Sequence, residues 1–153
     1  MKIKSTFLAG LLSLALLGSA GSAHAVITMT LQSGSTTITV TDGGAGDSNS
    51  AAGVITFIGA VGAFNINVTT GATSPATLGL GAVMDLNSFN TSSAAGTLTV
   101  TFQNTGLISP IGTNFFNSAI GGTTNTASLS YNLGVNGSSI LSGGPLSGAF
   151  AQT

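Results

Sequence analysis

The stretch TLTVTF, residues 97–102, carries the clearest strand pattern in the chain. Its apolar residues alternate with threonines, and successive side chains of a β-strand point to opposite faces of the sheet. We therefore expect Leu98, Val100 and Phe102 to face a hydrophobic core and the intervening threonines to face solvent. The stretch predicts a half-buried β-strand.

Similar alternating runs lie on both sides of this stretch. Breaks rich in Gly, Ser, Asn and Asp separate them, as is typical of turns between strands. We expect strands at 27–31, 37–41, 54–58, 64–69, 84–90 and 127–133, and a looser stretch around 114–120. Residues 42–53 are predicted to form a loop, residues 71–75 to close a hairpin, and the segment from there to Val83 to be either strand or coil.

No pattern of helical length follows residue 25. Short strands at this spacing, separated by Gly- and Ser-rich turns, predict an all-β fold, an antiparallel β-sandwich of the Ig-like or jelly-roll-like kind. We expect one such domain over residues 26–153. Low-complexity disorder is the alternative, and the periodic strands together with the 8 phenylalanines of the chain argue against it.

The first residues have the three-part design of a secretory signal. Lys2 and Lys4 precede an apolar stretch from Phe7 to Leu17, and small residues then lead to Ala23-His24-Ala25. This pattern predicts a helical signal peptide over residues 1–25, removed by signal peptidase after Ala25. A retained membrane anchor is the alternative, but the apolar stretch has only about half of the ~20 residues that a membrane-spanning helix needs.

Beyond Ala25 the chain has no Lys, Arg or His, so its only charged side chains belong to three aspartates, Asp42, Asp47 and Asp85. Phosphate backbones and anionic lipid surfaces are bound chiefly through Lys and Arg. We therefore expect neither nucleic-acid binding nor electrostatic membrane binding.

The same composition argues against catalysis. The predicted exported chain has no Cys, and it has no His or Lys that could activate a serine. It therefore lacks the side chains that nucleophilic hydrolysis requires. Glycoside cleavage needs only two carboxylic acids, so the three aspartates leave it formally open, but the chain has no Trp and no Arg to build a sugar cleft. We predict that the protein is not an enzyme and has no catalytic residues.

The run DGGAGDSN, residues 42–49, is the one candidate cation site. Two carboxylates and flexible carbonyl groups lie close together there, which suits calcium. The run is similar to the Gly-Gly-x-Gly-x-Asp calcium repeat, but its register differs by one residue and it occurs once. Asp42 and Asp47 are therefore predicted calcium ligands, against the more ordinary alternative of a hairpin loop that uses Asp and Gly for turn geometry.

Threonines alternate in two early runs, at Thr28 and Thr30 and again over 37–41. Such arrays are found on flat ice-binding faces, but those faces need a repeat of fixed period, and the sequence contains none. We expect the solvent-facing side of an ordinary sheet, since threonine favours strands.

Several segments together resemble the exported domain of PEP-CTERM sorting-domain proteins of Gram-negative bacteria that produce exopolysaccharide. The matching pieces are the early threonine-rich strands and residues 42–47, 53–57, 67–71, 84–88 and 96–100, within about 26–106. The resemblance implies a secreted β-sandwich of unassigned biochemical role, handled by a sorting system and associated with the cell envelope, biofilm or extracellular polymer.

The end of the chain departs from that family. Its members finish with a Pro-Glu-Pro signature, an apolar helix and a basic tail, whereas this sequence ends at Ala151-Gln152-Thr153, in a run that reads like the start of another strand. Either the reading frame is truncated, which we favour, or the protein is a freely secreted relative. A missing final strand would leave a sheet edge open to self-association.

These observations predict a non-enzymatic structural or matrix-associated protein, secreted or held on the outer cell surface. The expected partners are the export machinery, exopolysaccharide and copies of the chain itself. Two alternatives stay open: a β-sandwich module that binds polysaccharide or calcium, and the subunit of a self-assembling fibre.

Overall fold

The computed structural model describes residues 26–74, 83–105 and 117–152. The predicted signal peptide, most of the segment between Pro75 and Val83, and residues 114–116 of the looser stretch lie outside them. Every regular element in the described residues is a β-strand, and all strand pairs are antiparallel. The all-β prediction is confirmed.

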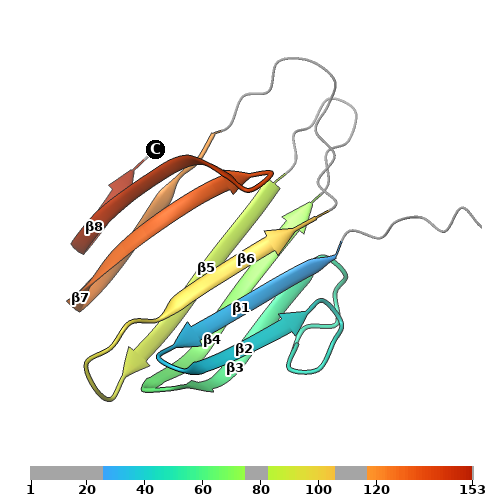
Figure 1. Ribbon diagram of the computed structural model, residues 1–153, viewed down its shortest axis with the longest axis horizontal. Helices are drawn as coiled ribbons and strands as arrows, with labels where there is room; N and C mark the ends of the chain where they lie inside the picture. Colours follow the sequence, from blue (N-terminus) through green and yellow to red (C-terminus); the bar gives the residue numbers. More distant parts are fainter. Residues whose placement is uncertain (1–25, 75–82, 106–116, 153) are drawn as a thin grey trace, which may run out of the picture. The chain divides into compact units, whose positions relative to one another are not determined.

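Eight strands follow one another within the described residues (Figure 1). They are β1 (Ile27–Ser33), β2 (Thr36–Thr41), β3 (Val54–Val61), β4 (Phe64–Ser74), β5 (Val83–Ser92), β6 (Thr99–Asn104), β7 (Ile120–Val135) and β8 (Ser138–Gln152). The predicted loop over 42–53 separates β2 from β3, as expected.

Two strands are longer than the stretches that the sequence predicted for them. β3 continues past a register shift between Phe57 and Gly59, and β4 continues through Gly71, which we expected to close the hairpin. Glycine at this point does not break the strand, because β4 lies between β3 and β5 and hydrogen bonds to both neighbours hold its backbone extended. β6 begins at Thr99 rather than at Thr97.

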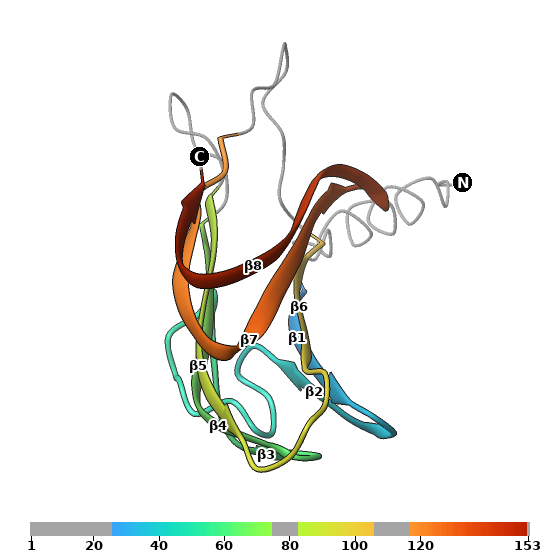
Figure 2. The ribbon, with the colours of Figure 1, turned by 90° about the vertical axis from the view of Figure 1, so that its left-hand side faces the viewer.

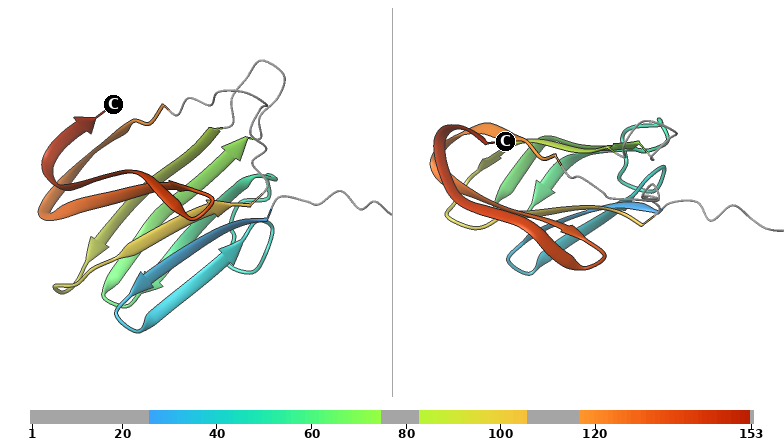
Figure 3. Two further views of the ribbon diagram at one scale, coloured as in Figure 1. Left: turned by 45° about the horizontal axis from the view of Figure 1, so that its top comes forward. Right: turned by 90° about the horizontal axis from the view of Figure 1, so that it is seen from above.

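The chain divides into two compact units, Met1–Ile111 and Gly112–Thr153, where the sequence led us to expect one sandwich over 26–153. Two compact units can still belong to one domain, so the single domain over residues 26–153 stays a prediction. Within the first unit, one sheet has the strand order β2-β1-β6 and the other the order β3-β4-β5. Figures 2 and 3 show these sheets as two facing layers, which confirms the β-sandwich.

The core of the first unit lies between the two sheets. Both contribute apolar side chains to it, at alternate positions of their strands. Its buried members are Ile27, Met29, Leu31, Val40, Ile55, Phe57, Val61 and Ile66. Leu98, Val100 and Phe102 are partly buried against this cluster, so the orientation predicted for residues 97–102 is confirmed.

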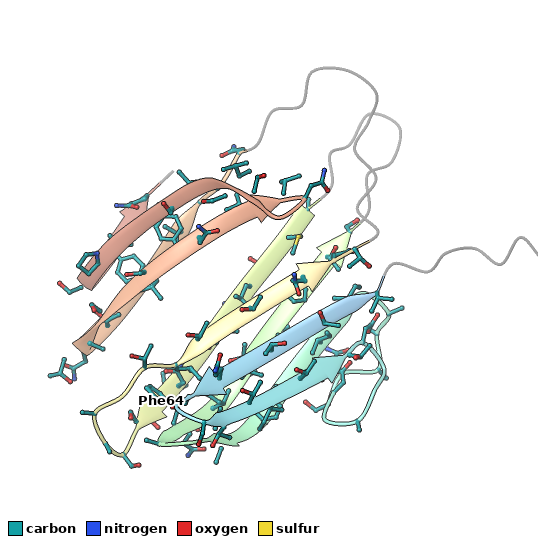
Figure 4. All side chains as sticks on the ribbon, viewed as in Figure 1. Phe64 is labelled. Atoms are coloured by element: carbon teal, nitrogen blue, oxygen red, sulfur yellow. The ribbon has the colours of Figure 1, made fainter. Side chains whose placement is uncertain are left out.

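β6 contacts β4 of the facing sheet through a ring packed on a glycine. A Cβ atom added to Gly71 would lie 2.5 Å from Cε2 of Phe102, so the phenyl ring rests directly on the glycine backbone. Beside this contact, Nδ2 of Asn104 donates a hydrogen bond of 2.7 Å to Oγ1 of Thr73. At the other end of β4, Phe64 is partly buried against the core, and Figure 4 marks its position.

The second unit contains one long antiparallel hairpin of β7 and β8. Asn136 and Gly137 form its turn with φ values of 51° and 79°, the positive pair that a type I′ turn requires. The sequence predicted the middle of β7. For β8 it indicated only the run at the end of the chain, read as the start of another strand, and this run is the end of β8. The Gly- and Ser-rich sequence of β8 has low strand propensity, and its pairing with β7 supplies the order that propensity does not.

Gly71→Ala tests the close approach of the sheets. We expect it to lower the free energy of unfolding by about 1–3 kcal/mol, because a methyl group there would displace the Phe102 ring from a packed core. Chemical denaturation monitored by circular dichroism measures the change. Gly121→Ala is the control, since the nearest atom to its added Cβ is 3.6 Å away. A Gly71→Ala cost that stays the same in a Phe102→Leu background would contradict this account.

Candidate functional site

The outer side of the sheet β2-β1-β6 carries a regular array of polar side chains, which we call the threonine face. The three strands pair in register, so seven threonines and two glutamines form three rows across the sheet. The rows are Thr41, Thr28 and Gln103; Thr39, Thr30 and Thr101; and Thr37, Gln32 and Thr99. All nine side chains are exposed or partly exposed, because the opposite side of β1 faces the core.

The array is regular in two directions. Side chains on one face of a strand repeat about every 6.6–6.8 Å, and neighbouring strands lie about 4.7–4.9 Å apart. Threonine is branched at Cβ and holds few χ1 rotamers, so its hydroxyl groups are pre-positioned. Oγ1 of Thr30 and Oγ1 of Thr39 lie 3.2 Å apart and share a hydrogen bond at the centre of the face.

The regularity of the face is a property of strand pairing and not of the sequence. Its three strands lie at 27–33, 36–41 and 99–104, so no fixed period runs along the chain. Sequence reasoning identified the early threonines and the stretch 97–102 separately and did not bring them together. The shared alternation of threonine with apolar residues was the available signal, and the register was the missing information.

The threonine face contains no charged, aromatic or aliphatic side chain. It offers neutral hydroxyl and amide groups, which both donate and accept hydrogen bonds. Threonine hydroxyl and glutamine amide groups do not titrate near neutral pH, and no acidic or basic side chain belongs to the nine residues of the face. The face therefore suits binding through many weak neutral contacts rather than proton transfer.

The loop between β2 and β3 holds the predicted cation ligands. The carboxylate of Asp47 accepts three backbone hydrogen bonds: Oδ2 from the amide of Gly43 at 3.0 Å, and Oδ1 from the amides of Asn49 and Thr56, each at 2.9 Å. One side chain thus joins the start of the loop, its middle and strand β3. The role is that of an internal scaffold for the loop.

These contacts also determine the charge state of Asp47. Partial burial raises the pKa of this carboxyl group, but the hydrogen bonds from the amides of Thr56, Asn49 and Gly43 outweigh burial and hold the pKa below its ordinary value of 3.8. The carboxylate is therefore ionised at neutral pH.

Asp42 lies at the start of the same loop, and its Oδ2 accepts a hydrogen bond of 2.8 Å from the amide of Gly53. An open depression of about 410 Å³ is lined by Gly43, Asp47, Ser48, Asn49 and Ser50. The loop brings the two carboxylates into one local structure, in which each serves backbone amides. Calcium binding by Asp42 and Asp47 stays a prediction, and a bound cation would have to compete with these amides for the carboxylate oxygens.

Asp85 belongs to β5, a different element from the loop, and its side chain is exposed. Within 26–74, 83–105 and 117–152, no three Asp, Glu, His or Cys side chains come together as a metal-binding group.

A second open depression, of about 370 Å³, lies in the β7–β8 unit and is lined by Ser118, Ile120, Tyr131, Leu141 and Gln152. The Tyr131 hydroxyl donates a hydrogen bond of 2.9 Å to Oε1 of Gln152 there.

Comparison with protein-family models, curated proteins and solved structures finds no match for this chain. The resemblance to the exported PEP-CTERM domain therefore stays a prediction made from the residues quoted above. In the part of the chain that the structure describes, no helix has the length and apolar character to cross a membrane.

Asp47→Asn tests the scaffold role of the loop carboxylate. Asparagine has one acceptor oxygen, so its amide nitrogen would face a backbone N–H that Asp47 now satisfies. We expect the free energy of unfolding at pH 7 to fall by about 1–2 kcal/mol. Asp85→Asn, which changes an exposed carboxylate on another element, should change it much less.

The same variants give a pH test. The folded-state pKa of Asp47 is lowered, so its contribution is complete at pH values above about 4 and is lost as the pH falls through the folded-state pKa. The stability difference between wild type and Asp47→Asn should therefore narrow in acid. A stability difference that stays constant from pH 7 to pH 2 would contradict the scaffold role of the Asp47 carboxylate.

A calcium titration that leaves the melting temperature of the wild type unchanged would remove the calcium prediction.

Proposed function

We propose that this protein is a non-enzymatic structural protein of the extracellular matrix or outer cell surface, and that the threonine face is its contact surface for neutral polysaccharide. The single observation that carries the proposal is the in-register array of nine neutral polar side chains on one side of β2-β1-β6. A polymer with regularly spaced hydroxyl groups can form many hydrogen bonds with such an array at once.

Charge supports a neutral ligand over an acidic one. The predicted exported chain has carboxylates at Asp42, Asp47 and Asp85 and no cationic side chain that could pair with sulfate, phosphate or uronate groups. Each hydroxyl contact with a sugar replaces a contact with water, so its net contribution is small, about 0.5–1.5 kcal/mol. Useful affinity therefore depends on repetition along the polymer.

Location and the absence of catalytic machinery support the structural role. The predicted signal peptide supports export from the cytoplasm, and the resemblance to PEP-CTERM proteins of exopolysaccharide-producing Gram-negative bacteria supports a matrix polymer as the partner. The three aspartates are the only strong side-chain acids of the exported chain, and two of them hold backbone amides of one loop. These features favour a protein that binds and packs over one that transforms a substrate.

Thr30→Val with Thr39→Val tests the proposed contact surface. Valine keeps the shape of threonine and removes the two hydroxyl groups that meet at 3.2 Å in the central row. In affinity electrophoresis through gels that contain a soluble neutral glucan, we expect the wild type to be retarded and the double variant to bind roughly fivefold more weakly or worse, as the loss of about 1 kcal/mol or more requires.

Thr56→Val with Thr70→Val is the matched control. These two hydroxyl groups also share a hydrogen bond, of 3.1 Å, but they lie on the other sheet. The control should bind the glucan like the wild type. If the wild type is not retarded by any of a panel of neutral glucans, mannans and galactans, or if both double variants lose binding equally, the threonine face is not the contact surface.

A further inference from the structure

Strand β5 (Val83–Ser92) is exposed along its whole length, unlike the other strands of the first unit. Four large apolar side chains on it remain in contact with solvent: Val83 is 57% exposed, Met84 39%, Leu86 43% and Phe89 60%. Leu86 pairs with buried Gly71, so the even-numbered residues from Met84 to Ser88 lie on the core side of the sheet, and the odd-numbered ones lie on its outer side. Apolar residues are therefore exposed on both faces of one strand.

The offset between the two sheets explains this exposure. β1 and β2 pack against β3, and β6 lies over β4 through Phe102 and Asn104. No described strand of the first unit is left to cover β5, which is also the last strand of its sheet and pairs only with β4 among the described residues. Among the described residues of the first unit, β5 thus has an open core side as well as an open backbone edge.

Most of the usual protections against edge pairing are missing from β5. Edge strands are normally guarded by charged side chains, above all lysine, by proline, by a bulge or by short length. Asp85 is the single charged side chain of β5. β5 has ten residues and neither Lys, Pro nor Gly, and the bulge in this part of the sheet belongs to β4, at Asn67. The register shift between β3 and β4, between Phe57 and Gly59, comes from the same extra residues of β4, so this bulge does not alter the free edge of β5.

We propose that β5 is a homodimer interface, on which β5 of a second copy of this chain pairs antiparallel and joins the two β3-β4-β5 sheets into one continuous sheet. The proposal does not depend on polysaccharide binding and can fail or succeed separately from it.

Charge and shape select one register for this pairing. When Leu86 faces Leu86 of the second copy, Asp85 faces the side-chain amide of Asn87, which can donate a hydrogen bond to the carboxylate. In the same register Val83 lies opposite Phe89 on the outer side, and Met84 lies diagonal to Leu86 on the core side, so the exposed apolar side chains contact one another. If Asp85 instead of Leu86 lay on the two-fold axis, each Asp85 would face Asp85 of the second copy. Two like charges would then lie opposite each other, which disfavours this register.

The symmetry of this pairing limits the assembly. Each copy contributes the same strand in the same way, so the contact is isologous and closes on itself as a dimer. Pairing through β5 alone therefore predicts a dimer and not a fibre.

Sedimentation velocity of the purified protein over a range of concentrations, without polysaccharide, tests the interface. We expect a monomer–dimer equilibrium, and a dimer association constant at least tenfold weaker for Leu86→Lys, which places like charges at the dyad. Ile58→Lys is the control: Ile58 is 60% exposed on β3 of the same sheet, so its replacement should leave the dimer intact. A wild type that is monomeric at all concentrations would overturn the proposal. If hydrogen exchange then shows that the β5 amides are protected in this monomer, another segment of the same chain covers the strand.

A cysteine scan tests the register without relying on a destabilised variant. The chain contains no cysteine, so each new thiol can be followed alone. In the proposed register, Leu86→Cys brings two identical side chains together, within reach of a disulfide, and should form a covalent dimer in oxidised glutathione. Ser88→Cys lies on the same face of the same strand but faces Met84 of the second copy. Cross-linking of Ser88→Cys as fast as Leu86→Cys would reject this register and the symmetric interface with it.

Discussion

The contact between Phe102 and Gly71 determines how the two sheets of the first unit meet. Only a residue without a side chain lets the phenyl ring lie on the backbone of β4, and the contact fixes β6 over β4 rather than over β5. Once β6 is placed, β1 and β2 cover β3, and the buried cluster from Ile27 to Ile66 fills the space between the layers. The uncovered strand β5 is a consequence of this placement.

A chain without cationic side chains beyond its predicted signal cannot neutralise a carboxylate by an ion pair. Asp47 and Asp42 instead receive hydrogen bonds from backbone amides, and these bonds give the loop between β2 and β3 a defined shape. The sequence suggested metal coordination and turn geometry as the two alternatives for this loop. The observed hydrogen bonds belong to turn geometry, because carboxylates that fold back on nearby amides are what Asp- and Gly-rich turns use.

The sequence predicted what depends on local alternation and missed what depends on distant pairing. The period of two at 27–31 and 97–102 correctly identified strands and their core-facing side, because burial of one face imposes that period. β8 was underestimated, since its order comes from β7 and not from its own residues. The threonine face and the exposure of β5 both follow from the register and offset of sheets built from segments far apart in the chain, which no short pattern encodes.

The neutrality of the threonine face has a consequence for the conditions in which it can work. Contacts between charged groups weaken as dissolved ions screen them, and at seawater-like ionic strength that screening acts within a few ångströms. Hydroxyl and amide groups carry no net charge to screen, and none of them gains or loses a proton over the environmental pH range. A surface built from Thr and Gln alone therefore offers the same contacts in fresh, brackish and saline water.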